Sequence, residues 1–384
     1  MKLDHVVNIA DLRTMAKRRL PSAVFDLLDG AAGDEVTERS NRSSFSSIEF
    51  RPRPFVDVSK RDLSTLVFGQ RISMPVMLAP TGAGRVAHRS AELAVAEAAS
   101  AADTIYMQST VTGFPLEDVA AAASRPLWYQ LYLPPDRSAT VNMLKRVADS
   151  GYTGLSITID TPIFGNRERD MHNRVTMPMK ITPKLLAQGA VRPRWAMDFM
   201  RGNLSGSVPL LARMRPGKHM MSMTATSSQI LATQWPVTLE DIEFVRSNWE
   251  GPLLVKGVIG TGVADRLASL GVDGVIVSNH GGRQLDGVPA AISVLPDIVD
   301  EADGRFDVFL DGGIRRGADV VKAVALGAKA VFIGRPYLYG LAAGGEAGVE
   351  RALRIFYNEI DRTMALLGAR TIDELDRSLI RGAQ

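Results

Sequence analysis

The chain of 384 residues contains no cysteine. This absence excludes disulfides, thiolate nucleophiles, cysteine-ligated zinc and iron–sulfur clusters, and we predict no metal site. Long apolar stretches are also missing, since no run approaches the roughly 20 apolar residues that a membrane-spanning helix needs. Residues 1–13 lack the apolar core of a secretion signal, and a net charge of only +3 gives no case for nucleic-acid binding. These absences indicate a globular protein, and we expect a cytoplasmic one.

The sequence does contain a repeated alternation of short apolar runs and helix-like segments. Eight runs rich in Val, Ile and Leu are each closed by glycine, proline or a polar residue, which is typical of strands buried on both faces of a parallel sheet. These runs are 75–82, 105–110, 127–133, 154–160, 252–257, 274–280, 307–313 and 330–336. Segments of helical period lie between them, including 91–101, 139–148, 239–248 and 317–327. The count of eight predicts an α/β fold with a single closed (β/α)8 barrel, and an open doubly wound sheet is the alternative.

Two regions depart from this alternation. Residues 1–70 precede the first strand and predict an N-terminal cap with helices at 9–19 and 23–39, followed by an irregular stretch at 40–55. Residues 163–236 form a long insertion between strands four and five, where one helix would normally suffice. We expect residues 71–384 to form the barrel, ending in a helix at 345–367, and residues 1–384 to act as one domain.

Polar residues and glycines gather where the predicted strands end, which is where barrel enzymes place their active sites. The strand-end residues are Pro80, Thr81, Gly82, Ser109, Thr110, Gln130, Tyr132, Thr158, Asp160, Lys256, His280, Asp311, Gly312, Gly313, Gly334 and Arg335. One such residue would be unremarkable, but their convergence predicts a large polar ligand in the barrel mouth.

The last two strand ends suggest phosphate. Asp311 begins the segment DGGIRRG, which leads into a helix, and Gly334 with Arg335 follows the eighth strand. Glycines expose backbone N–H groups, a helix N-terminus favours an anion, and arginine binds phosphate through two parallel hydrogen bonds. A pair of tight turns with solvated arginines is the alternative.

His280 is the candidate general base. Of the five histidines, it alone lies at a predicted strand end beside glycines, and imidazole titrates near neutrality. A lone histidine is more often structural, but Arg283 three residues later suits an anionic substrate. Asp160 could orient the imidazole or serve only as a turn residue. Lys256 ends an otherwise apolar strand and therefore needs an anionic partner.

A dinucleotide-like pattern, G-x-G-x-x-A at 82–87, is a false lead. That pattern also requires an acidic residue at the end of the next strand, where this chain has Ser109 and Thr110. We therefore do not expect NAD to bind there.

Four motifs resemble the FMN-dependent 2-hydroxy acid oxidases and dehydrogenases. They are SNHGGRQLD at 278–286, DGGIRRG at 311–317, IGRP at 333–336 and WYQLY at 128–132. The resemblance keeps its order over nearly the whole chain. It implies FMN as cofactor, oxidation of a small L-2-hydroxy acid to the 2-keto acid, and a homotetramer.

The resemblance also implies residue roles. His280 corresponds to the catalytic base paired with Asp160, and Tyr132 to a hydroxyl that contacts the oxygen on the reacting carbon. Arg283 and Arg167 correspond to the clamp on the substrate carboxylate. The implied contacts to the flavin ring are Pro80, Thr81, Gly82, Ser109, Gln130, Thr158, Ser278 and Lys256, of which Lys256 steadies negative charge on the ring. The implied ribityl-phosphate contacts are Asp311, Gly313, Arg315, Gly334 and Arg335.

Two residues that line the substrate pocket depart from the family pattern. Leu27 stands where the family usually has a tyrosine that touches the substrate carboxylate, and Val111 stands where glycolate oxidase has a tryptophan. Both changes make the pocket more apolar or roomier. We therefore expect a lactate- or mandelate-like substrate with a larger or more apolar side chain than glycolate's.

The insertion resembles that of the membrane-associated mandelate and lactate dehydrogenases at 167–174 and 192–195. Between residues 179 and 235, eight basic residues and seven methionines accompany a single acidic residue, Asp198. Basic charge mixed with apolar anchors suits an anionic bilayer, so we expect peripheral contact with the inner face of the cell membrane. A lid over the active site and a subunit contact are the alternatives.

The electron acceptor is either quinone or oxygen, and Gly82, where glycolate oxidase has alanine, resembles the dehydrogenases. Two other functions stay open from the residues alone. One is an FMN- or phosphate-binding barrel with isomerase or lyase chemistry, and the other is a protein that only carries flavin.

Overall fold

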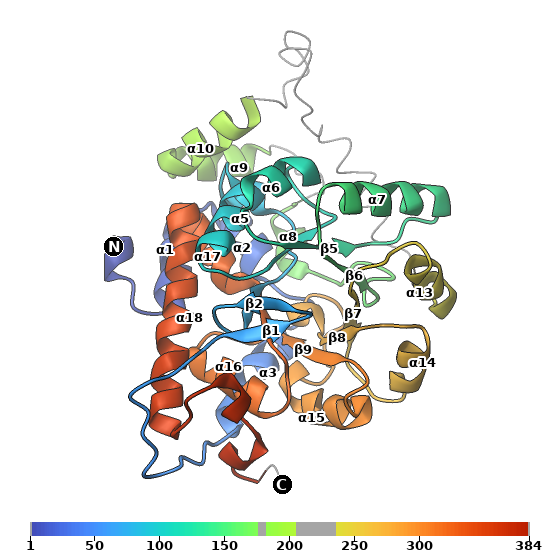
Figure 1. Ribbon diagram of the computed structural model, residues 1–384. Coiled ribbons are helices and arrows are strands. Elements are labelled where there is room, and N and C mark those ends of the chain that lie inside the picture. Colours follow the sequence, from blue (N-terminus) through green and yellow to red (C-terminus); the bar gives the residue numbers. More distant parts are fainter. Residues whose placement is uncertain (1, 176–181, 205–235, 383–384) are drawn as a thin grey trace.

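A computed structural model describes residues 2–175, 182–204 and 236–382. Its centre is a closed barrel of eight parallel strands in the order β10-β3-β4-β5-β6-β7-β8-β9 (Figure 1). The strands are β3 (Val76–Leu78), β4 (Tyr106–Ser109), β5 (Leu127–Leu131), β6 (Gly154–Thr158), β7 (Leu253–Val258), β8 (Gly274–Val277), β9 (Asp307–Asp311) and β10 (Val331–Ile333). Each lies within or beside one of the eight predicted runs. The predicted (β/α)8 barrel is confirmed, and the open-sheet alternative is wrong.

Helices alternate with these strands along the chain and surround the barrel (Figure 1). They are α4 (Gly84–Ala87), α5 (Ala91–Ala101), α6 (Leu116–Ala122), α7 (Arg137–Asp149), α13 (Leu239–Arg246), α14 (Ala264–Ser269), α15 (Ala291–Ala302), α16 (Gly317–Ala325), α17 (Arg335–Gly344) and α18 (Glu346–Leu367). The predicted helix at 91–101 coincides with α5, and the one at 345–367 with α18. Apolar positions at helical spacing face the barrel here, so the period alone identifies these helices.

The N-terminal cap contains α1 (Ile9–Arg19), α2 (Ser22–Asp29) and α3 (Val36–Ser43). The single helix predicted at 23–39 is wrong, because residues 30–35 leave the helical path and bond to barrel loops. Ala32 N–H donates to Gly282 O at 2.9 Å, and Gly33 N–H donates to Asn166 O at 2.8 Å. The stretch predicted as irregular at 40–55 instead begins with the end of α3 and a short 3-10 helix, η2 (Ser44–Ser47).

An aromatic layer fills the barrel interior. Trp128, Phe309 and Phe332 are fully buried, with ring centroids 5.9–6.3 Å apart. Gly154 and Gly274, the first residues of β6 and β8, lie against the rings of Trp128 and Phe309. A two-stranded hairpin that was not predicted from the sequence packs Phe68 onto the same layer. It consists of β1 (Thr65–Val67) and β2 (Gln70–Ile72). The barrel is therefore solid where its strands begin and can be open only where they end.

The described part of the insertion forms α8 (Glu168–His172), α9 (Pro183–Ala190) and α10 (Pro193–Leu204), and the last two lie beside each other in Figure 1. The buried Trp195 fixes α10 to the barrel, since its indole N–H donates to Val86 O at 2.9 Å. Much of the basic segment 179–235 lies outside the described residues. Within the described ranges, no helix combines the length and apolarity that crossing a membrane requires.

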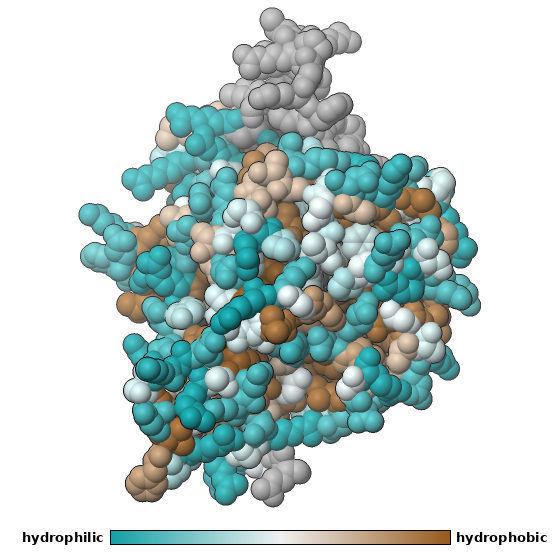
Figure 2. Space-filling model, viewed as in Figure 1, coloured by the Kyte–Doolittle hydropathy of each residue, from teal (hydrophilic) through white to brown (hydrophobic). Residues whose placement is uncertain are grey.

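The outer surface is mainly polar. On the face shown in Figure 2, hydrophilic residues predominate and hydrophobic residues form scattered groups between them. Large exposed apolar side chains also occur in the insertion, including Leu186, Val191, Met197 and Met200.

Candidate active site

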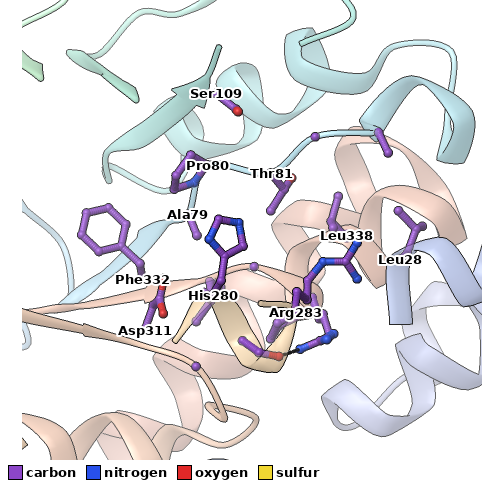
Figure 3. Close-up of a pocket in the computed structure, with 18 of the residues that line it drawn as sticks. Leu28, Ala79, Pro80, Thr81, Ser109, His280, Arg283, Asp311, Phe332 and Leu338 are labelled. Carbon is purple, nitrogen blue, oxygen red and sulfur yellow. Dashed lines mark hydrogen bonds between the residues drawn. The ribbon is translucent and has the colours of Figure 1, made fainter. Parts of the chain in front are cut away.

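The predicted site residues surround one hollow at the ends of the strands. The hollow encloses about 1190 Å³, including the part open to solvent, and Figure 3 shows the His280 ring among residues from several strand ends. Its lining contains Leu27, Pro80, Thr81, Gly82, Ser109, Val111, Tyr132, Arg167, Lys256, His280, Arg283, Asp311, Gly313, Arg315, Gly334 and Arg335. Asp160, Gln130, Thr158 and Ser278 are not part of the lining, although Asp160, Gln130 and Ser278 bond directly to residues that are.

His280 has an unusual backbone. Its φ of 58° lies in the left-handed region, and Gly281 and Gly282 follow with φ of 64° and 76°. A non-glycine residue in this region costs roughly 1–3 kcal/mol and persists only where its surroundings impose it. The N–H of His280 donates to Ser278 Oγ at 3.0 Å, and this bond helps hold the imidazole in the hollow.

The imidazole of His280 is paired with Asp160. Its Nδ1 lies 3.1 Å from Asp160 Oδ1 and 3.3 Å from Oδ2. Burial lowers the pKa of His280, and the carboxylate opposes that shift. Burial also tends to raise the pKa of Asp160, but the charge and hydrogen bond of His280 outweigh it and lower that pKa. An ionised Asp160 accepts from Nδ1–H, so Nε2 is the nitrogen left to accept a proton.

Two arginines lie beside this pair. Arg283 donates from Nη1 to Gly30 O at 2.6 Å, and Arg167 donates from Nε to Arg283 O at 3.3 Å. Burial, and then repulsion from Arg167, lower the pKa of Arg283 far below its ordinary value. Burial likewise lowers the pKa of Arg167. Two desolvated cations side by side make a strong site for a small anion.

Tyr132 completes this side of the hollow. Burial, followed by the negative charge of Asp160, raises the pKa of its phenol well above the ordinary value. The phenol therefore keeps its proton at neutral pH and can donate a hydrogen bond.

Lys256 is buried and bonded within the protein. Its Nζ lies 2.8 Å from Asp311 Oδ2 and donates to Ser278 Oγ at 2.7 Å. The sequence predicted an anionic partner for Lys256, and in this structure that partner is Asp311. Because Ser278 also accepts from the His280 N–H, the lysine and the histidine are linked through one hydroxyl.

Several buried polar atoms fit an FMN molecule. Among the residues that the structure describes, Gln130 Nε2, Thr158 Oγ1, Asp311 Oδ1 and Arg335 Nε have no hydrogen-bond partner although they are buried. Such atoms are rare in folded proteins, and here they offer donors and acceptors to a bound molecule. Amide and hydroxyl groups suit the flavin ring, and guanidinium groups suit a phosphate.

The loop after β9 gives the same indication. Gly312 and Gly313 have φ of 92° and 81°. At Gly313 a Cβ atom would lie 2.1 Å from Asn41 O, so only glycine fits where the loop passes the cap. Arg315 and Arg335 line the hollow beside this loop. The residues present therefore fit the cofactor that the resemblance implies.

Part of the wall of the hollow is apolar. Leu27 and Leu28 from α2, Val111 after β4 and Phe164 after β6 line it. The space at Gly82 is limited, because a Cβ there would lie 3.3 Å from Val111 Cγ1. Leu28 and Phe164 were not predicted from the sequence, although each adjoins a residue or motif that was.

Comparison with known proteins agrees with this geometry. The family model described as FMN-dependent dehydrogenase matches residues 16–382. A peroxisomal (S)-2-hydroxyacid oxidase of Arabidopsis thaliana is 40% identical over 379 residues, which cover 99% of this chain and 97% of that protein. (S)-Mandelate dehydrogenase of Pseudomonas putida is 38% identical over 371 residues, which cover 97% of this chain and 93% of that protein.

A solved structure is also similar. The crystal structure of monotopic membrane protein (S)-mandelate dehydrogenase superimposes with a TM-score of 0.89 at 37% identity, covering 98% of this chain and 99% of that one. The names of these relatives describe oxidases and dehydrogenases. They do not favour the alternative of isomerase or lyase chemistry.

Proposed function

Because the chain belongs to the family of FMN-dependent dehydrogenases, and is thus an FMN-dependent oxidoreductase of 2-hydroxy acids, we propose how its residues divide the reaction. The observation that carries the proposal is the contact of 3.1 Å between His280 Nδ1 and Asp160, beside the buried Arg283. This arrangement combines a base with a binding site for an anion. A 2-hydroxy acid needs both.

When bound, FMN supplies the acceptor for the two electrons and the second proton that leave the CH–OH carbon. Our proposal assigns the first proton to His280 Nε2. Asp160 holds the ring and stabilises the imidazolium that forms, as a carboxylate does beside a catalytic histidine. Arg167 and Arg283 bind the substrate carboxylate, and Tyr132 donates to the oxygen on the reacting carbon.

Other residues at and just after the strand ends hold FMN in this proposal. The flavin ring is assigned to Pro80, Thr81, Gly82, Ser109, Gln130, Thr158, Ser278 and Lys256, and the ribityl phosphate to Asp311, Gly313, Arg315, Gly334 and Arg335. The unpartnered atoms of Gln130, Thr158 and Arg335 support this division.

The substrate, we propose, is a lactate- or mandelate-like L-2-hydroxy acid with a larger or apolar side chain. Leu27, Leu28, Val111 and Phe164 form the apolar wall that supports it. A panel of 2-hydroxy acids, ranked by kcat/KM, tests the proposal. Glycolate as the best substrate would overturn it.

The electron acceptor and the location form a linked proposal. Gly82 and the basic insertion support a quinone at the inner face of the membrane rather than oxygen. Rates of flavin reoxidation by oxygen and by a soluble quinone analogue decide between the two. We further propose a cytoplasmic homotetramer in which residues 1–384 act as one domain, with a cap at 1–70, a barrel at 71–384 and an insertion at 163–236.

The test of the reaction is spectroscopic. Purified protein loaded with FMN should show the visible flavin band, and anaerobic addition of mandelate should bleach it. Protein that cannot take up FMN, or a band that no 2-hydroxy acid bleaches, overturns the proposed function.

His280→Ala tests the base. Flavin reduction should slow by roughly 10²–10⁴-fold, which is the usual contribution of a positioned base. His5→Ala is the matched control, because His5 is exposed in a short N-terminal helix. Reduction of the His280 variant at near wild-type speed would overturn the assignment.

A further inference from the structure

The cap segment at residues 30–35, between α2 and α3, connects the two clamp arginines. Gly33 N–H donates to the carbonyl of Asn166 at 2.8 Å, and Ala32 N–H donates to the carbonyl of Gly282 at 2.9 Å. Asn166 immediately precedes Arg167, and Gly282 immediately precedes Arg283. The segment thus bonds to the backbone just before each arginine and bridges the two loops that carry them.

The same segment also contacts the arginine side chains directly. The carbonyl of Gly30 accepts from Arg283 Nη1 at 2.6 Å and from Arg335 Nη2 at 2.8 Å. One backbone oxygen therefore places a substrate arginine and an arginine of the phosphate loop. Any movement of residues 30–35 would change the position of Arg283 and its separation from Arg167.

Arg169 holds this segment in place. It lies on α8, two residues after Arg167, and its guanidinium bonds to Glu35, to Asp29 Oδ2 at 3.3 Å, and approaches Asp26 Oδ1 at 3.8 Å. Its side chain also packs on the segment, since a Cβ atom at Gly30 would lie only 3.3 Å from Arg169 Cδ. Three carboxylates of the cap thus converge on one cation of the insertion.

The carboxylates are fixed on the cap side as well. Glu35 adopts a φ of 58°, and its Oε1 accepts from the N–H of Ala31 at 2.9 Å, which closes the segment on itself. Asp29 accepts from both Nε and Nη2 of Arg13 at 2.7 Å and from the phenol of Tyr339 at 2.7 Å. Its pKa falls to about 2, because these hydrogen bonds outweigh the effect of burial. The pairing with Arg169 is therefore built on a rigid base.

From these contacts we propose that Arg169, together with Glu35 and Asp29, is a positioning unit that sets the separation of Arg167 and Arg283 and so determines the affinity for the substrate carboxylate. None of the three lines the hollow. They act through residues 30–35 and touch neither substrate nor cofactor. The inference rests on the proposed function, since it assumes that the two arginines bind a carboxylate.

Arg169→Met tests the proposal, because methionine keeps much of the side-chain length and removes the charge. The protein is used loaded with FMN. Anaerobic rapid mixing gives the dissociation constant and the limiting rate of flavin reduction for mandelate and for its uncharged analogue mandelamide. We expect binding of mandelate to weaken by about tenfold, binding of mandelamide to change by less than about threefold, and the limiting rate to stay within about threefold.

Three further variants sharpen the experiment. Glu35→Gln breaks the same ion pair from the side of the cap. The double variant of Arg169→Met and Glu35→Gln should lose no more affinity for mandelate than either single variant, as expected for residues that act as a unit. Arg169→Lys keeps the charge but lacks the planar fork of guanidinium donors, so an intermediate loss is expected. Arg146→Met is the control, because it breaks the exposed pair of Arg146 on α7 with Glu117 on α6.

Two outcomes overturn the proposal. Either mandelate binding is unchanged in both Arg169→Met and Glu35→Gln, or mandelate and mandelamide weaken by the same factor, as a general loss of structure would cause. Failure of the proposed function looks different, because wild-type flavin would then not be bleached by mandelate. In that event, titration with phenylacetate still tests the inference. The change in the flavin spectrum gives the dissociation constant of this carboxylate for the wild type and for each variant.

Discussion

At the scale of single residues, the role proposed for His280 leads to a prediction about pH. Catalysis requires the neutral imidazole, and burial lowers the pKa of His280 below its ordinary value of 6.5. The kcat/KM should therefore be level at neutral pH and fall only as the pH drops through that lowered pKa. Asp160→Asn removes the charge that favours the protonated ring, so the fall should move to still lower pH.

The same variant should also lower the plateau of kcat/KM by at least about tenfold, because the imidazolium that forms in the reaction loses its counter-charge. A pH profile of kcat/KM for mandelate measures both effects. A fall that moves to higher pH in Asp160→Asn contradicts the pairing of the two residues.

A second prediction concerns Leu27, which lines the apolar wall. Leu27→Tyr adds bulk and a hydroxyl where the pocket is now apolar, so small substrates should gain on large ones. We expect the ratio of kcat/KM for glycolate to that for mandelate to rise by about tenfold or more, within the range known for small changes in pocket volume. Leu366→Tyr on the exposed face of α18 is the control. An unchanged ratio would mean that Leu27 does not contact the substrate side chain.

At the scale of elements, the first residue of β6 shows how tightly the barrel is filled. A Cβ at Gly154 would lie 2.7 Å from three ring atoms of the fully buried Trp128. Gly154→Ala should lower the free energy of unfolding by about 1–3 kcal/mol, the usual cost of overpacking. Gly260→Ala is the control, because nothing lies within 4 Å of that position and its φ is not in the left-handed region. Urea unfolding of both variants, loaded with FMN, measures the difference.

Elements with a strong period could be predicted from the sequence, and those shaped by distant contacts could not. Predicted helices at 9–19 and 91–101 coincide with α1 and α5, because apolar spacing is a local property. The break at residues 30–35 escaped prediction, since it depends on bonds to Asn166 and Gly282, more than 130 positions along the chain. A local signal does exist in Gly30 and Gly33. A glycine is tolerated inside a helical pattern at a cost of about 1 kcal/mol, so this signal alone does not end the predicted helix.

The candidate site divides in the same way. Side chains at strand ends could be placed near one another because a barrel brings those ends together, and His280, Arg283 and Lys256 do line one hollow. The carbonyl of Gly30 could not be foreseen, because every residue has a carbonyl. Nor could the partner of Lys256, since the choice of Asp311 depends on the register of neighbouring strands.

At the scale of the whole molecule, charge is distributed unevenly. Residues 179–235 contain eight of the 45 Lys and Arg but one of the 42 Asp and Glu, so the rest of the chain is slightly acidic. Large apolar side chains are exposed next to this charge, with Leu186 on α9 at 62% and Val191 just after α9 at 67%. Exposed apolar groups among cations favour an anionic bilayer surface over open solvent.

This distribution predicts binding to vesicles. The protein loaded with FMN should sediment with vesicles that contain phosphatidylserine and not with neutral phosphatidylcholine vesicles, and added salt should release it, because screening weakens the attraction between charges. Met197→Glu with Met200→Glu places two acidic groups on the exposed face of α10, where the methionines are 47% and 52% exposed. We expect this double variant to lose most of its vesicle binding. Leu366→Glu on α18 is the control and should retain vesicle binding, since Leu366 is 74% exposed and thus more exposed than either methionine. If the protein binds both vesicle types equally, or if the methionine double variant binds as well as Leu366→Glu, the insertion is instead a lid or a subunit contact. The mass of the protein in solution would then distinguish these two roles.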